Sequence, residues 1–131
     1  MKLDELIRAA HDARSKAHAP YSKFLVGAAV LADDGRMFIG ANVENASYGL
    51  ALCAERSAVA AAVVAGVRKL VACAVVTSSS PPASPCGMCR QMLAEFGADD
   101  LRVILENEKG EREEATLGQL LPRAFRGDAL K

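Results

Sequence analysis

The sequence predicts an α/β fold in which helices cover both faces of a mixed five-stranded sheet, a three-layer α-β-α sandwich. Two observations carry this prediction. Helical and strand patterns alternate along the chain after a first amphipathic helix, and two short turn signals each join a pair of strands directly. The pattern contains no internal repeat and no linker, so we expect residues 1–131 to form one catalytic domain.

The first part of the chain predicts one helix and a hairpin. Apolar residues recur at helical spacing along one face of the first helix: Leu3, Leu6, Ile7, Ala10 and Ala13. Pro20 lies in the loop that follows. Strands are predicted at 26–31 and 36–39, because Asp33-Asp34-Gly35 between them is a hairpin signal.

The rest of the chain alternates between strands and helices. Residues 40–52 show no clear period and are rich in Asn, Ser and Gly, which predicts a loop. A helix at 54–65 that stops at Gly66, a strand at 70–77 and a helix at 87–96 with Gly97 as its C′ residue are expected next. A strand at 101–105 and a strand near 112–115 follow, joined by a turn at Asn107 to Gly110. The last element expected is a short helix at 117–121, ended by Pro122.

Composition excludes several classes of protein. Lys plus Arg equals Asp plus Glu at 16 each, so no net positive charge is available to attract nucleic acid. No apolar run approaches the roughly 20 residues that span a bilayer. We expect the charged, amphipathic N-terminus not to be a signal peptide and the protein to be cytoplasmic, where cysteines serve metal binding in preference to disulfides.

Three cysteines and one glutamate carry the chemistry. Cys53 and Glu55 stand in C-A-E, and Cys86 and Cys89 stand in P-C-G-M-C. A ligand two residues before a glutamate, followed later by P-C-x-x-C, is typical of zinc-dependent nucleobase deaminases. Three protein ligands leave a fourth zinc position for water, which is the catalytic arrangement. Glu55 is then placed to move protons rather than to bind the metal.

The spacing of these residues supports one metal site. Cys86 and Cys89 are three apart, so they share a face of the predicted helix. Cys53 and Cys86 each begin a predicted helix, where partial positive charge favours thiolates. Three thiolates leave a net negative charge on the zinc site, and Arg56, on the helix face of Cys53, is expected to offset it by hydrogen bonding.

Other metal ligands are conceivable. Cys73 lies in an apolar run that reads as a buried strand, so we favour a core residue. The alternative is a fourth ligand in a closed structural site, which leaves Glu55 without a role. His11 and His18, on or just after the first helix, are the remaining candidates, and surface positions are expected for both.

The chain resembles the small, free-nucleoside type of cytidine deaminase over nearly its whole length. The resemblance rests on the metal motifs and on these segments: Pro20-Tyr21-Ser22-Lys23-Phe24, Val26-Gly27-Ala28-Ala29, Asn42-Val43-Glu44-Asn45-Ala46, Ser84-Pro85 before Cys86, Arg90-Gln91 after Cys89, and Leu120-Leu121-Pro122 with Phe125. Two residues depart from the family's pattern. Ser57 stands where the family usually has Thr, and Ala41 stands where it often has Cys.

The resemblance implies a role for each matching residue. One Zn²⁺ per chain is held by Cys53, Cys86 and Cys89, and Glu55 shuttles protons. Phe24 packs against the pyrimidine ring, and the backbone of Ala54 and Cys86 orients the base. Asn42 and Glu44 bind the ribose hydroxyls. These two residues are two apart and face one side of an extended segment, but without the resemblance we would favour ordinary loop capping for both.

The resemblance also implies assembly and activity. We expect a homotetramer with shared active sites, in which Ala46, Tyr48 and Phe125 line the pocket of an adjacent subunit. The expected reaction is hydrolytic deamination of cytidine and deoxycytidine to uridine and deoxyuridine, with release of ammonia, in pyrimidine salvage. The alternatives are a deaminase of another cytosine nucleoside such as blasticidin S, a polynucleotide deaminase, and a non-catalytic zinc module.

Overall fold

The structure is a computed structural model that describes residues 2–130. A five-stranded sheet lies at its centre, with strand order β2-β1-β3-β4-β5. β3 and β4 are parallel and the other three pairs are antiparallel, which confirms the predicted mixed sheet. The strands are β1 (Gly27–Ala32), β2 (Met37–Ala41), β3 (Leu70–Thr77), β4 (Arg102–Asn107) and β5 (Arg112–Thr116).

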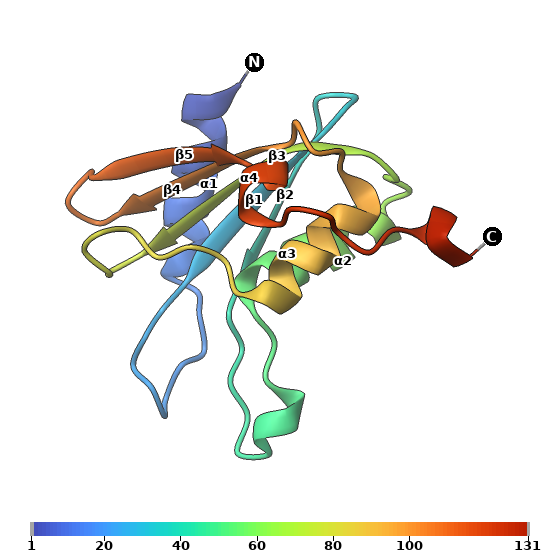
Figure 1. Ribbon diagram of the computed structural model, residues 1–131. Coiled ribbons are helices and arrows are strands. Elements are labelled where there is room, and N and C mark those ends of the chain that lie inside the picture. The colour runs from blue at the N-terminus through green and yellow to red at the C-terminus, as the bar shows by residue number, and fades with distance from the viewer. Residues whose placement is uncertain (1, 131) are drawn as a thin grey trace.

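Helices cover both faces of the sheet, as predicted. Figure 1 shows α1 (Leu3–Arg14) on one face and α2 (Ala54–Val64) with α3 (Gly87–Phe96) on the other. One apolar cluster joins α1 to the sheet and a larger one joins α2 and α3 to it. The shorter helices are η1 (Tyr48–Leu50), α4 (Leu117–Leu120) and η2 (Gly127–Leu130). Within residues 2–130, no helix is long and apolar enough to cross a membrane.

Two glycines let the helices lie directly on the sheet. A Cβ on Gly40 of β2 would stand 2.4 Å from both the carbonyl oxygen of Ala54 and the backbone nitrogen of Ala58. A Cβ on Gly27 of β1 would stand 2.1 Å from the carbonyl oxygen of Ala10. Because Gly40 meets the first turns of α2, this close approach fixes the start of the helix that follows Cys53.

The predicted helix ends differ in their conformations. Gly66 follows α2 with a φ of +97°, the left-handed residue expected there. The prediction for Gly97 is wrong, since its backbone is extended, with φ −135° and ψ 150°. Glycine is needed at position 97 for packing instead, because a Cβ there would lie 2.2 Å from Cδ1 of Leu101.

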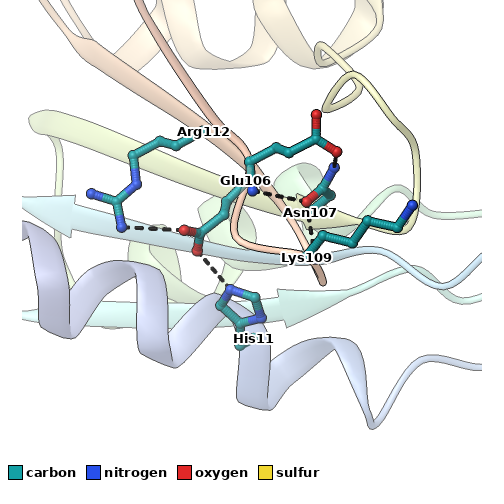
Figure 2. A network of polar contacts seen from close by, with 6 residues as sticks. His11, Glu106, Asn107, Lys109 and Arg112 are labelled. Carbon is teal, nitrogen blue, oxygen red and sulfur yellow. Dashed lines mark hydrogen bonds and ion pairs between the residues drawn. The ribbon is translucent and has the colours of Figure 1, made fainter.

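A polar network ties the β4–β5 hairpin to the rest of the fold (Figure 2). His11 Nε2 of α1 lies 2.6 Å from Oε2 of the buried Glu106, and Arg112 donates to the other oxygen at 3.2 Å. The buried Asn107 donates to the carbonyl oxygen of Ser79 at 3.0 Å. The turn after β4 is thereby attached to the loop that leads from β3 toward Cys86.

Candidate active site

Three cysteine side chains meet where α2 and α3 begin. Cys53 is the N-cap residue of α2, Cys86 is the N-cap residue of α3, and Cys89 lies in the first turn of α3. Their sulfur atoms all lie within 4.8 Å of one another, and those of Cys86 and Cys89 are 3.5 Å apart. Sulfur ligands of a tetrahedral zinc ion stand about 3.8 Å apart, given Zn–S bonds of about 2.3 Å. The three sulfur atoms therefore fit one zinc ion and leave a fourth position open.

The surroundings of these thiols also favour a cation. Burial, and after it the charge of Glu55, raises the pKa of the Cys89 thiol far above its ordinary value. Burial also opposes ionisation of Cys86, but hydrogen bonds from Cys89 and other neighbours outweigh it and lower the pKa of Cys86. A thiolate at Cys89 therefore needs a positive charge beside it, which a bound zinc ion supplies.

Arg56 lies against the first of these cysteines. Its Nη2 stands 3.8 Å from Sγ of Cys53 and donates to the carbonyl oxygen of Ala51 at 3.1 Å. The hydrogen bond to Cys53 raises the pKa of Arg56 further. Its Nε is buried and has no hydrogen-bond partner among residues 2–130. The guanidinium thus stands where it offsets negative charge on the sulfur atoms.

Glu55 is the buried carboxylate of the site. It lies in the first turn of α2 and is only 5% exposed. Burial raises the pKa of Glu55, and hydrogen bonds from its own backbone and from Cys89 oppose that rise without cancelling it. A carboxyl group with a raised pKa is suited to accept and release protons near neutral pH.

A cavity of about 300 Å³ opens beside Glu55. This volume is at the lower end of the range for small-molecule sites. Most of its wall is apolar, and the predicted substrate residues Phe24, Asn42, Glu44 and Ala54 all line it together with Cys53 and Cys86. The structure thus brings two of the three predicted metal ligands, Cys53 and Cys86, and four predicted substrate residues to one cavity.

Asn42 and Glu44 hold the loop before β1 through their side chains. Asn42 donates to the carbonyl oxygen of Phe24 and accepts from the backbone N–H of Val26, each at 2.8 Å. Glu44 accepts from the backbone N–H groups of Tyr21 and Ser22, at 3.0 and 3.1 Å. Both residues therefore hold a loop and also line the cavity, and their contact with a sugar stays a prediction.

Three predicted residues lie outside this cavity. Tyr48 is 79% exposed in η1 and packs edge-on against Tyr21, with ring centroids 6.4 Å apart. Ala46 is exposed in the same loop. Phe125 is 60% exposed, and its carbonyl oxygen accepts from Gln91 of α3. Within one chain, none of the three lines the cavity beside Glu55.

The other possible metal ligands lie elsewhere. Cys73 is fully buried in the core on β3, as expected, and burial raises the pKa of its thiol. His11 pairs with Glu106 on the opposite face of the sheet, and the backbone of His18 pairs with that of Val43. Among residues 2–130, the group that can hold a metal ion consists of the three cysteines alone.

Comparison with known proteins agrees with this geometry. Residues 1–105 match the family described as the cytidine and deoxycytidylate deaminase zinc-binding region. The cytidine deaminase of Sporosarcina psychrophila is 50% identical over 125 residues, 95% of this chain and 92% of the relative. That of Halalkalibacterium halodurans is 51% identical over 120 residues, 92% of this chain and 91% of the relative.

The chain belongs to the cytidine and deoxycytidylate deaminase family. A solved structure of cytidine deaminase from Burkholderia pseudomallei matches with a TM-score of 0.91 and 50% identity, over 95% of this chain and 100% of that one. The structure from Mycobacterium leprae matches with a TM-score of 0.81 and 46% identity, over 94% and 99%. The fold class is confirmed, the chain is a deaminase, and zinc is its cofactor.

Sequence reasoning missed several residues at this site of the deaminase. Thr77, at the end of β3, and Ser84, before Cys86, both line the cavity. Arg90 fixes the approach to Cys86, because it donates to the carbonyl oxygen of Pro85 and to the hydroxyl of Ser84. These residues follow no periodic pattern. For Ser84 and Arg90, the signal in the sequence was their place in segments that carry the resemblance, beside the metal motif; Thr77 had none.

Proposed function

We propose that this protein catalyses the zinc-dependent hydrolytic deamination of cytidine and deoxycytidine to uridine and deoxyuridine, with release of ammonia. The observation that carries the proposal is that Glu55 lines one cavity together with Cys53 and Cys86, whose sulfur atoms lie within 4.8 Å of that of Cys89. Its relatives named cytidine deaminase match nearly the whole chain. Such a reaction serves pyrimidine salvage.

The proposed roles follow from where the side chains stand. Zinc, when held by Cys53, Cys86 and Cys89, supplies the Lewis acidity that makes water nucleophilic at neutral pH. Glu55 accepts the proton that the water loses and delivers it to N3 of the pyrimidine ring. After the oxygen has added at C4, Glu55 carries the second proton to the C4 amino group, which leaves as ammonia.

The walls of the cavity hold the nucleoside in this proposal. Phe24 contacts the face of the pyrimidine ring, and the backbone of Ala54 and Cys86 orients the base. Asn42 and Glu44 bind hydroxyl groups of the sugar. Their position at the same cavity as Glu55 supports a nucleoside over a free base.

The proposal extends to the assembly and location of the protein. We infer that residues 1–131 act as a single catalytic domain in a cytoplasmic homotetramer with shared active sites. Ala46, Tyr48 and Phe125 would line a neighbour's cavity, and the exposure of both aromatic rings supports this role. None of the four cysteines is in a disulfide, as is usual in a reducing compartment.

The test is direct. Purified protein mixed with cytidine should lower the absorbance at the long-wavelength edge of the ultraviolet band, where cytidine absorbs more than uridine, and release one ammonia for each uridine formed. Deoxycytidine should react and free cytosine should react poorly. Blasticidin S as the sole substrate would support the rival nucleoside deaminase, and no reaction with any cytosine compound would support the non-catalytic zinc module.

A further inference from the structure

Ser22 joins the two halves of the proposed nucleoside site. Its hydroxyl donates to Oε2 of Glu44 and accepts from the backbone N–H of Phe24, the latter at 3.0 Å. Glu44 belongs to the proposed sugar site and Phe24 to the proposed base site. A single exposed hydroxyl therefore connects a sugar contact with a base contact.

The surrounding hydrogen bonds hold Glu44 in one orientation. Its Oε1 accepts from the backbone N–H groups of Tyr21 and Ser22, and its Oε2 accepts from the Ser22 hydroxyl. An ionised carboxylate offers about four acceptor positions, so about one remains for a ligand. Hydrogen bonds from Ser22 also keep the pKa of Glu44 below its ordinary value, which keeps it an acceptor.

Phe24 is held from both sides of its backbone. Ser22 accepts from its N–H, and Asn42 donates to its carbonyl oxygen at 2.8 Å. Lys23, between Ser22 and Phe24, has a φ of +62°, a conformation that non-glycine residues rarely adopt. A residue keeps this conformation where its neighbours hold it in place. Here the hydrogen bond from the Phe24 N–H to the Ser22 hydroxyl bridges Lys23.

We propose that Ser22 is a positioning residue that sets sugar specificity, because its hydroxyl fixes Glu44 toward the sugar and Phe24 toward the base at the same time. The inference rests on the proposed function. Ser22 itself does not contact the substrate in this proposal. Removing the hydroxyl leaves Glu44 held through Oε1 alone, so its Oε2 should lose its fixed direction and selection for sugars that carry hydroxyl groups should weaken.

The experiment compares cytidine with 2′,3′-dideoxycytidine, which lacks the hydroxyl groups for Glu44 and Asn42. Ser22→Val and Ser22→Thr have the same shape and differ in the hydroxyl, and Ser22→Ala is a second hydroxyl-free variant. In Ser22→Val, kcat/KM for cytidine should fall about tenfold more than that for the dideoxynucleoside, mainly through KM. Ser22→Thr should restore the wild-type ratio.

Two controls separate positioning from general damage. Ser15→Ala removes a hydroxyl that donates to the carbonyl oxygen of Asp12 at the end of α1, and it should keep the wild-type ratio. If Ser22 acts through Glu44, adding Ser22→Val to Glu44→Ala should leave the ratio of that variant unchanged.

The outcomes are distinct. Equal losses on both substrates, or no loss, in an active Ser22→Val protein overturn the inference and leave the proposed function standing. Loss of folding in both hydroxyl-free variants also overturns it, since the role of Ser22 is then structural. A wild-type protein inactive on both nucleosides refutes the proposed function and this inference with it.

Discussion

Replacing Glu55 by glutamine should abolish most of the activity while leaving the zinc site intact. Gln keeps the size of the buried side chain but cannot carry a proton. Of the residues that line the described cavity, the other carboxylate is Glu44, whose oxygens are already engaged by Tyr21 and Ser22. With no substitute base nearby, we expect kcat to fall about 10³- to 10⁴-fold, or roughly 4–5.5 kcal/mol in activation free energy.

The same substitution should stabilise the metal-free protein. Burial raises the pKa of folded Glu55 above that of the unfolded chain, which is about 4.3. As pH rises from that value through the folded pKa, the unfolded chain loses its proton first, so the wild-type protein loses stability. Gln does not titrate, so the Tm of Glu55→Gln should exceed that of the wild type by a margin that grows over this pH window.

The assays are cytidine turnover by absorbance, zinc content by elemental analysis, and Tm of the chelated proteins from pH 4 to 8. Glu95→Gln, an exposed change on α3, is the matched control and should alter none of these. Near-normal turnover in zinc-loaded Glu55→Gln would remove Glu55 from the mechanism. If the difference in Tm between Glu55→Gln and the wild type became smaller as pH rises, burial would not raise the pKa of Glu55 as stated.

Three further predictions address metal, substrate and assembly. Cys73→Ser should retain one zinc per chain, because Cys73 lies in the core apart from the three ligands; lost zinc by elemental analysis would contradict the three-cysteine site. Cytidine 5′-monophosphate should have a much lower kcat/KM than cytidine, because Glu44 repels a phosphate that approaches it, and comparable values would refute this. Phe125→Ala should raise KM and weaken the oligomer. Phe125→Ala protein is then mixed with Glu55→Gln protein, and mass measurement verifies that subunits have exchanged. The hybrid oligomers should be more active than either parent, because some sites combine an intact Glu55 with a neighbour's intact Phe125. No recovery would mean that Phe125 serves its own chain.

The sequence predicted the fold and the metal group well because both depend on strong local signals. The i, i+3 spacing of Cys86 and Cys89 and the apolar run of β3 each determine local structure. Gly97 was misassigned because a glycine at a helix end suits either a left-handed turn or a close contact, and only the position of Leu101 distinguishes them.

The cavity wall was harder to predict. Asn42 and Glu44 could be placed on one side of an extended segment, but their partners in the loop before β1 lie about 20 residues away in sequence. Ser22 stands in a segment that carries the resemblance, but nothing there indicated its role, and Thr77 is a small polar residue outside any motif spacing. Their roles depend on tertiary contacts that periodicity and composition do not encode.

The central claim is that three cysteines hold the zinc required for cytidine deamination. Its most direct test is to remove the metal with a chelator, confirm by circular dichroism that the protein is still folded, and titrate zinc back while following uridine formation. We expect no turnover without metal and a linear recovery that ends at one zinc per chain. Full activity in the folded, zinc-free protein, or no uridine at any zinc content, would contradict it.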